Sequence, residues 1–595
     1  MATRLLFIIC FSLSLSSFAQ LYVENSAYVF VNDQIITVTD DINLNNTDSK
    51  IYLRNEAQLI QKNNVGNTGI GQLSVQQSGT VNQYTYNYWC SPIGNNSASS
   101  GNEDFRVELI DESTGLISSI DVSFTGAGGF DSSLSPLTIA SPWLWTFIAS
   151  DEYSDWSYVG DTGNILPGLG FTMKGVGTGA TGSQLYDFRG KPNNGTISNT
   201  VSAPVAGDPQ WTLVGNPYPS AIDSRDFIHD TQNQNSITGT LLYWEQQQGQ
   251  SSHNTNTYIG GYATYTINAA GTVESFVPAV FSTYDDQGQE VGAFPGPGGI
   301  KTAERYIPIG QGFMVEGSVG STGTVRTTND MRVYETESGG NSFFFRTSGE
   351  AEYNTVAYDE DGFNVVPEDF RRFRINVAFN ETLSRQLLMN FHNSATDGFD
   401  YGLEGRSPEG VDSDAYWILD DAPFVIQALQ FDEALKIPLV VKADEQQSIR
   451  FKIVDVQNFA DSQPIYIHDK ENDIYVDLRA QDYDINIEEG TFTDRFEIVF
   501  IQEDTLSIVE STLDTLKVIQ DNTNAQLTIL NPNALSIKSV SLIDIAGKQL
   551  WNKVNIGSNN TYNYSTSDLS EGVYLASIRL ENNATLTQKI IVSHK

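Results

Sequence analysis

Carboxylates are the most abundant residues in this sequence that could carry chemistry, with 73 Asp and Glu against 33 Lys and Arg. Asp397, Asp400, Asp412 and Asp414 lie close together in the sequence, and the run 359–362 forms a second acidic group. Calcium prefers clustered carboxylate and carbonyl oxygens, so the first four residues are candidate calcium ligands. Neither group has the glycine that stands sixth in an EF-hand loop. The alternative is that both groups are solvated acidic loops.

The other reactive residue types do not form a recognised catalytic pattern. Each of the five histidines is separated from the next by at least 24 residues, which argues against a zinc site. No Gly-x-Ser-x-Gly sequence occurs, and we expect Cys90 to be a buried small hydrophobic residue. The paired carboxylates of a glycosidase are close in space rather than in sequence, so spacing does not reveal them. We expect no enzyme and no cofactor other than calcium, with a glycan hydrolase as the alternative.

Aromatic residues are densest at Trp143, Trp145, Tyr153 and Trp156. Aromatic rings have apolar faces that suit the apolar faces of sugars, so this cluster is a candidate platform for surface glycans. The competing interpretation, which we favour from the sequence, is that Trp143 and Trp145 alternate into a sandwich core.

Three blocks of sequence occur twice in the same order. Residues 86–94 correspond to 211–219, residues 142–145 to 241–244, and residues 166–174 to 307–316. The third block contains Gly-x-Gly-Phe without the strand and helix of a phosphate-binding loop. We therefore expect Gly170 and Gly312 to form turns with positive φ that bring Phe171 and Phe313 into equivalent buried positions.

Short alternating runs separated by turn residues are typical of β-strands throughout the chain. Their close spacing over residues 21–80 favours a small solenoid-like roll or a sheet cap. From about residue 340 the strands are richer in charge, which is typical of a β-sandwich with one solvated face per sheet.

The first 19 residues have the composition of a secretory signal peptide. Arg4 supplies a positive charge, residues 5–15 are mostly apolar, and Ser17-Phe18-Ala19 fits a small-x-small cleavage site. No later segment has the roughly 18 or more apolar residues of a membrane helix. The formal net charge of −40 repels phosphates, which excludes nucleic acid as a partner. We expect a protein exported to the cell surface or the extracellular space.

The last seventy or so residues contain three further motifs, at 540–548, 569–575 and 587–592. Two glycines lie where hairpins need special backbone angles, between alternating strands. This pattern resembles the type A C-terminal sorting domain of Bacteroidetes type IX secretion system cargo. The residues that carry the resemblance are Asp544, Gly547, Leu569, Gly572, Tyr574 and Lys589.

The resemblance implies a small immunoglobulin-like sandwich that the type IX outer-membrane translocon and its cargo shuttle recognise. It also implies export through the periplasm, commonly with removal of this domain. Upstream blocks such as 214–223 resemble large Bacteroidetes surface proteins of unassigned function. We expect a non-catalytic, adhesin-like surface protein, with a secreted carbohydrate-binding protein or glycan hydrolase as the alternative.

The expected fold class is all-β, with several tandem β-sandwich or β-roll domains before the sorting domain. Thr505 and Thr515 each lie in an Asp-Thr-Leu sequence that resembles the acceptor of Bacteroidetes O-glycosylation. The expected segments are a signal peptide (1–19), a short-strand roll or cap (20–83), β-domain copy 1 (84–205), β-domain copy 2 (206–338), a β-sandwich (339–503), a linker (504–524) and the sorting domain (525–595).

Overall fold

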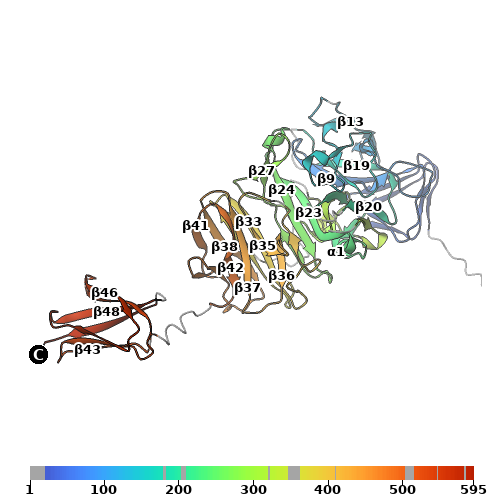
Figure 1. Ribbon diagram of the computed structural model, residues 1–595. Helices are drawn as coiled ribbons and strands as arrows, with labels where there is room; N and C mark the ends of the chain where they lie inside the picture. The colour runs from blue at the N-terminus through green and yellow to red at the C-terminus, as the bar shows by residue number, and fades with distance from the viewer. Residues whose placement is uncertain are drawn as a thin grey trace, which may run out of the picture. The chain divides into compact units, whose positions relative to one another are not determined.

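The computed structural model describes residues 20–126, 128–177, 183–202, 209–318, 322–345, 359, 362–408, 410–502, 513, 515–545, 547–581 and 584–594. The chain divides into two compact units, Met1–Ile501 and Gln502–Lys595. Both are built from β-strands (Figure 1), and the described part of the larger unit contains a single short α-helix, α1 (Ser224–Ile228). The expected all-β class is confirmed.

The first strands stack in parallel as a small β-solenoid with three faces. One face holds β1 (Leu21–Val23), β4 (Ile42–Leu44) and β7 (Thr68–Gly69), the second β2 (Tyr28–Asn32), β5 (Lys50–Arg54) and β8 (Gln72–Thr80), and the third β3 (Ile35–Val38) and β6 (Gln58–Gln61). Ile42, Ile51 and Leu59, one from each face, are fully buried. The solenoid-like roll expected for this region is present.

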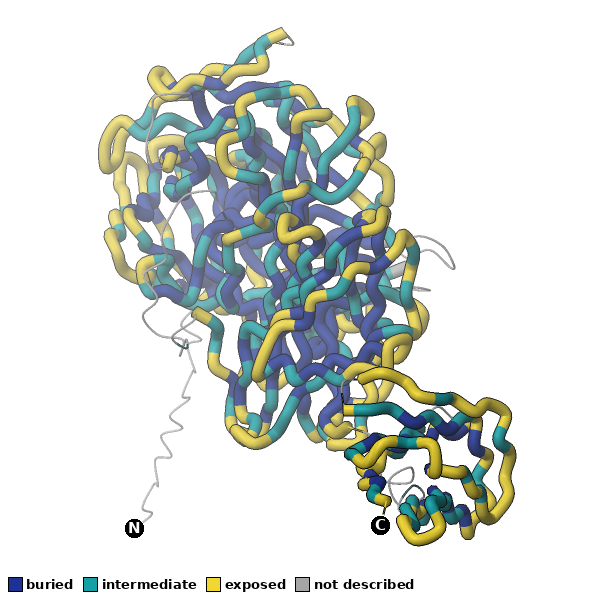
Figure 2. The backbone as a smooth tube through the Cα atoms, turned by 90° about the vertical axis from the view of Figure 1, so that its left-hand side faces the viewer, coloured by how far each residue is buried: buried dark blue, intermediate teal, exposed yellow. Residues whose placement is uncertain are grey.

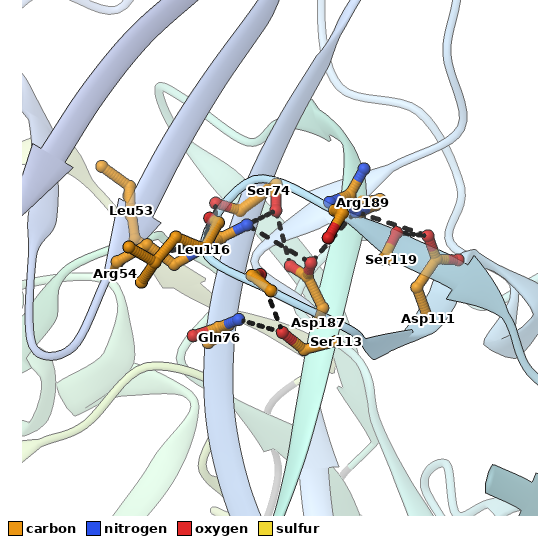
Figure 3. A network of polar contacts seen from close by, with 12 residues as sticks. Leu53, Arg54, Ser74, Gln76, Asp111, Ser113, Leu116, Ser119, Asp187 and Arg189 are labelled. Atoms are coloured by element: carbon orange, nitrogen blue, oxygen red, sulfur yellow. Dashed lines mark hydrogen bonds and ion pairs between the residues drawn. The ribbon is translucent and has the colours of Figure 1, made fainter. Parts of the chain in front are cut away.

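A buried ionic network joins the solenoid to the strands that follow it (Figure 3). Arg54 of β5 lies 3.4 Å from Asp187 of β19 (Ser183–Pro192), and the Ser74 hydroxyl donates to the same carboxylate at 2.6 Å. Arg189 lies 3.0 Å from Asp187 and 3.3 Å from Asp111 of β11 (Ile110–Ser113). Arg54 and Asp187 are almost inaccessible to solvent, and removing Asp187 would leave the Arg54 guanidinium as an uncompensated buried charge, at a cost of roughly 3–5 kcal/mol.

The repeated blocks form two equivalent pairs of antiparallel strands. The pairs are β9 (Tyr86–Cys90) with β18 (Gly170–Lys174), and β21 (Trp211–Gly215) with β29 (Gly312–Gly317). In both pairs the glycine that begins the second strand faces the last residue of the first strand. Phe171 and Phe313 therefore occupy equivalent positions, and both are fully buried, as the repeat predicts.

The two strand pairs also contact each other reciprocally. The Cys90 N–H donates to the Gly310 carbonyl at 2.8 Å, and the equivalent N–H of Gly215 donates to the Gly168 carbonyl at 3.3 Å. A Cβ added to Gly215 would lie 2.5 Å from the Cβ of Cys90. The two copies are thus related by an approximate two-fold axis that passes between Cys90 and Gly215.

The glycines of each Gly-x-Gly turn have different roles. Positive φ is found at the first glycine, with +82° at Gly168 and +78° at Gly310. The expectation of positive φ at Gly170 and Gly312 was wrong. These second glycines are required by packing, since a Cβ at Gly312 would lie 2.9 Å from the backbone nitrogen of Trp89. Each copy therefore needs its second glycine so that the other copy can approach.

Most of the buried apolar side chains described between residues 20 and 345 belong to one hydrophobic core, which runs from Val23 to Phe345. Figure 2 shows the buried backbone continuing through the interior of the larger unit. β20 (Ile197–Ser202) pairs with β30 (Thr322–Thr327), which joins the first copy to the second. The segments 20–83, 84–205 and 206–338 are therefore parts of one packed body, because their apolar faces are buried against one another.

The next segment forms a single eleven-stranded sheet. Its strands are β32 (Arg371–Phe379), β33 (Leu383–Phe391), β34 (Gly405–Arg406), β35 (Asp414–Leu419), β36 (Ala422–Leu429), β37 (Lys436–Ala443), β38 (Gln447–Gln457), β39 (Tyr466–Asp469), β40 (Ile474–Asp477), β41 (Tyr483–Ile487) and β42 (Gly490–Val499). The sheet curls into a nearly closed barrel around its own core, where two separate sheets of a sandwich were expected. Long twisted strands allow this closure, because a sheet that coils can bury one face on itself.

The smaller unit is a sandwich of two sheets. One sheet holds β43 (Lys517–Asp521), β44 (Gln526–Leu530) and β47 (Thr561–Ser565), and the other β45 (Ile537–Asp544), β46 (Gln549–Gly557), β48 (Gly572–Leu580) and β49 (Thr585–Val592). Leu527 from the first sheet packs with Leu542 and Ile590 from the second. The strand β43 begins inside the segment 504–524 that was expected to be a linker.

Candidate ligand-binding pocket

Alternation along the repeated strands places two sets of side chains on opposite faces. One set, which includes Phe171 and Phe313, enters the shared core. From the opposite set, Tyr86, Tyr88, Thr172, Trp211 and Met314 line a pocket. Because β9 and β18 belong to the first copy and β21 and β29 to the second, both copies contribute to this pocket.

The pocket has a volume of about 570 Å³. Eleven of its twenty-three lining residues are aromatic. Besides those on the repeated strands, the rings include Trp145, Trp156, Trp244, Tyr258, Tyr262 and Tyr284. Trp145 is on β16 (Trp145–Thr146), Trp244 on β23 (Ile237–Gln246) and Tyr262 on β24 (Ile259–Ile267). Small-molecule sites are concave, mostly apolar and of roughly 300–1,000 Å³, so this pocket is the candidate functional site.

The rings are held in place by one another. Tyr88 is stacked on Trp244, with ring centroids 6.4 Å apart and an angle of 10° between the planes. Its hydroxyl is hydrogen bonded to that of Tyr262 at 2.8 Å. Trp156 packs edge-on against Tyr88 with a centroid distance of 6.0 Å. The floor of the pocket is therefore formed before any ligand arrives, which lowers the entropy cost of binding.

The rim of the pocket is acidic and comes from two loops. Asp151 and Glu152 precede the turn that carries Tyr153, and Glu290 begins β27 (Glu290–Ala293). The hairpin between β26 (Ser282–Tyr284) and β27 meets the first loop, since a Cβ at Gly288 would lie 2.3 Å from the Tyr153 ring. No Lys, Arg or His is among the lining residues of the pocket as described.

A buried lysine lies behind one wall of the pocket. Lys174 follows Thr172 on the same face of β18, and its Nζ lies 3.6 Å from the centroid of the Trp143 ring. The same ammonium is 4.8 Å from the ring centroids of both Tyr86 and Tyr258, and it donates to the Tyr258 hydroxyl at 2.6 Å. Aromatic faces attract cations, whereas burial lowers the pKa of Lys174 to about 6.

A chain of hydrogen bonds connects Lys174 with the solvent. His253 is stacked on Trp143, and its Nδ1 lies 3.1 Å from the Lys174 Nζ. The other ring nitrogen of His253 lies 2.9 Å from the Asp131 carboxylate, whose side chain is 68% exposed. Tyr86 and Tyr258 separate this chain from the pocket, since both rings contact Lys174 and both line the pocket.

Replacing Lys174 with Met should stabilise the larger unit below about pH 8 and flatten its pH dependence. The ordinary pKa of lysine is 10.5, and burial lowers that of Lys174 to about 6. Between these values the unfolded chain binds one more proton than the folded chain, so the free energy of unfolding rises with pH, by up to about 1.4 kcal/mol per unit. Calorimetry from pH 6 to 9 should show the advantage of Lys174→Met shrinking as pH rises. Lys62→Met, at an exposed position, is the control and should show the pH dependence of the wild type. If the free energy of unfolding changed with pH equally in all three proteins, the prediction would be contradicted.

Comparison with protein families gives one match that spans most of the chain. The family model described as domain of unknown function DUF8693 matches residues 8–107 and 129–500. The chain belongs to this family. A second model, the domain of unknown function DUF8694, matches residues 506–592. The boundary between the two models coincides with the boundary between the two compact units.

Comparison with individual proteins adds no function. No curated protein matches. Among solved structures, the 47-kilodalton lipoprotein Tp47 of Treponema pallidum is 10% identical, with a TM-score of 0.12, over 63% of this chain and 92% of that chain. The BSP domain of a biofilm associated protein is 9% identical, with a TM-score of 0.12, over 88% of this chain and 90% of that chain. Scores this low carry no argument about the DUF8693 fold or its role.

The aromatic cluster predicted from the sequence lies at this pocket. Trp145, Tyr153 and Trp156 line it, while Trp143 forms part of the surroundings of Lys174. The expectation that Trp143 and Trp145 enter the core was wrong. Trp143 ends a single 3-10 turn and Trp145 begins β16; the residue between them, Leu144, is the one that enters the core.

The candidate calcium ligands are not gathered into one site. Asp414 is buried and accepts hydrogen bonds from Arg385 at 2.7 and 3.2 Å. Asp400 accepts a hydrogen bond from the Thr396 hydroxyl at 3.1 Å within its own loop. Across the described residues, no three Asp, Glu, His or Cys side chains are placed to share a metal ion. Asp397 and Asp412 are thus left without the partners that a calcium site needs.

The predicted sorting residues occupy hairpin and strand positions in the smaller unit. Gly547, with φ +82°, follows β45, and its N–H donates to the Asp544 carbonyl at 3.0 Å. Tyr574 of β48 is mostly buried and donates its hydroxyl to the Ser570 carbonyl at 2.8 Å. Leu569 and Gly572 precede it and are half-buried, whereas Lys589 of β49 is exposed. Of the two predicted glycosylation sites, Thr505 lies outside the described residues and Thr515 is half-buried.

Sequence reasoning missed the surroundings of Lys174 and most of the pocket. Lys174, His253 and Asp131 are brought together from positions 79 and 122 residues apart. No local motif marks such a cluster. Besides the aromatic cluster near Trp145, the usable signal was the repeat, because it already paired Trp145 with Trp244, and both line the pocket.

Proposed function

We propose that the protein is an exported, non-catalytic, adhesin-like protein that binds a glycan in its aromatic pocket. The preformed pocket with eleven aromatic lining residues is the observation that carries this proposal. A sugar ring has one or two faces of C–H groups, which pack on aromatic rings, and hydroxyls, which bond to carboxylates and amides at the rim. Both kinds of partner are present, since Asp151, Glu152, Gln287, Gln289 and Glu290 surround the rings.

The proposed export route is the type IX secretion system, with the smaller unit as its signal. The support is the resemblance of residues 540–592 to the type A sorting domain, together with the signal peptide pattern at residues 1–19. The smaller unit packs its own two-sheet core, which is what a separable signal requires. Cell-surface or extracellular placement follows from this route.

A glycan array probed with the mature chain, residues 20–595, tests the binding proposal. We expect binding to at least one neutral oligosaccharide, and a loss of tenfold or more in affinity for Trp145→Ala, about 1.4 kcal/mol. Trp145 is suitable because it is half-buried on the short strand β16. Tyr28→Ala in the solenoid, at a residue that is 57% exposed, is the matched control and should bind normally.

Two outcomes would overturn the proposal. Failure of every glycan to bind would remove the proposed ligand class. Release of shorter products from a bound glycan would replace a binding protein with a hydrolase, whose acids would then be sought among the three carboxylates of the rim.

A further inference from the structure

Every charged residue among the described residues that line the pocket is acidic. Its lining contains the carboxylates Asp151, Glu152 and Glu290 and no basic side chain. Glu290 accepts a hydrogen bond from the Ser282 hydroxyl at 2.8 Å. The guanidinium of Arg385 is close enough to influence Glu290, but Arg385 is committed to Asp414 at 2.7 Å.

Lys174 does not supply a positive charge that would balance these carboxylates where the ligand binds. Its amine lies behind the rings of Tyr86 and Tyr258, which form the pocket wall. It donates to the Tyr258 hydroxyl at 2.6 Å instead of pointing at open space. Burial also lowers the pKa of this amine to about 6, so most copies are neutral at pH 7.5.

We infer that the pocket selects uncharged glycans and rejects glycans that carry carboxylate or sulfate groups. This inference rests on the proposed function and names the substrate class of the same site. Neutral sugars stack on the rings and donate hydroxyl hydrogen bonds to the rim carboxylates, which accept but cannot donate. An acidic sugar brings a further negative charge close to the three rim carboxylates. Its charged group loses water there and meets no basic side chain among the described lining residues.

The test compares a neutral oligosaccharide with its counterpart oxidised at C6 to uronic acids. Titration calorimetry of the mature chain at pH 7.5 and low salt should give an affinity about tenfold or more weaker for the oxidised glycan. Raising the salt concentration from about 0.05 to 0.5 M should bring the two affinities closer together, because salt screens the repulsion between exposed charges.

The triple variant Asp151→Asn, Glu152→Gln, Glu290→Gln identifies the source of the discrimination. We expect the ratio of the two affinities to fall to within about threefold. The neutral glycan should bind measurably but more weakly than it binds the wild type, because its hydroxyls lose the charged acceptors at the rim. Both affinities are measured on one sample, so a partly unfolded preparation does not change their ratio. Equal binding of both glycans by the wild type, or an unchanged ratio in the triple variant, would overturn the inference alone. If neither glycan binds, the proposed function fails and this inference fails with it.

Discussion

Replacing Phe171 or Phe313 with alanine is expected to lower the free energy of unfolding of the larger unit by about 3–5 kcal/mol in each case. Both side chains are fully buried at equivalent positions of the repeat. Phe171 packs against Phe105 with a centroid distance of 5.5 Å, and Phe313 against Phe227 at 5.4 Å. Each truncation leaves a cavity that the surrounding β-strands cannot close, because their positions are fixed by backbone pairing.

Calorimetry of the full chain should show the transition of the larger unit at lower temperature for both variants, with the smaller unit unaffected. Phe30→Ala, at an exposed position of β2, is the matched control and should shift that transition little. A loss below about 1 kcal/mol for either core variant would contradict this prediction, because a fully buried phenylalanine would then contribute little to the stability of the larger unit.

Removing residues 503–595 is expected to leave a folded larger unit trapped in the periplasm. The proposed signal is the smaller unit, and the larger unit ends at Ile501 with its own cores complete. A cut at residue 521 would leave most of β43 attached, including the buried Leu516 that precedes it, and would expose part of a core. A cut at 502 avoids this damage, so a loss of export can be assigned to the signal.

Fractionation of the native host, with immunoblotting of medium, outer membrane and periplasm, measures the outcome. The full-length chain made from the same promoter is the control and should leave the periplasm. Protease resistance of the trapped protein should match that of the full-length larger unit. Normal amounts of the truncated protein at the surface or in the medium would show that residues 503–595 are not the signal.

The sequence predicts local features of this fold well because those features depend on alternation and turn chemistry. The strands of the solenoid, of the curled sheet and of the smaller unit occur where alternating runs predict them. Phe171 and Phe313 are buried at equivalent positions because the same Gly-x-Gly-Phe pattern forms the same turn twice. The aromatic cluster near Trp145 also marks the region of the pocket correctly.

Features that depend on distant contacts were not predictable in the same way. Gly170 and Gly312 looked like turn residues, yet their requirement comes from the close approach of the other copy. The alternation of Trp143 and Trp145 is plain in the sequence, but which face looks inward depends on Leu144 and its partners. In the sequence Asp414 resembled a metal ligand, but in the structure its carboxylate accepts a hydrogen bond from Arg385, which comes from another strand.

The approximate two-fold axis between Cys90 and Gly215 relates the two copies that form the pocket, so the asymmetry of the pocket comes from differences in sequence between the copies. Reciprocal contacts of this kind are the mark of an isologous interface, in which two identical subunits present the same patch to each other. Here the patches are in one polypeptide, so positions that symmetry would keep identical are free to diverge. Tyr86 lines the pocket together with its counterpart Trp211, and Thr172 together with its counterpart Met314. A linear ligand whose two ends differ could therefore bind in one orientation only, because the two halves of the pocket differ. A pocket between two identical subunits would accept either orientation equally well.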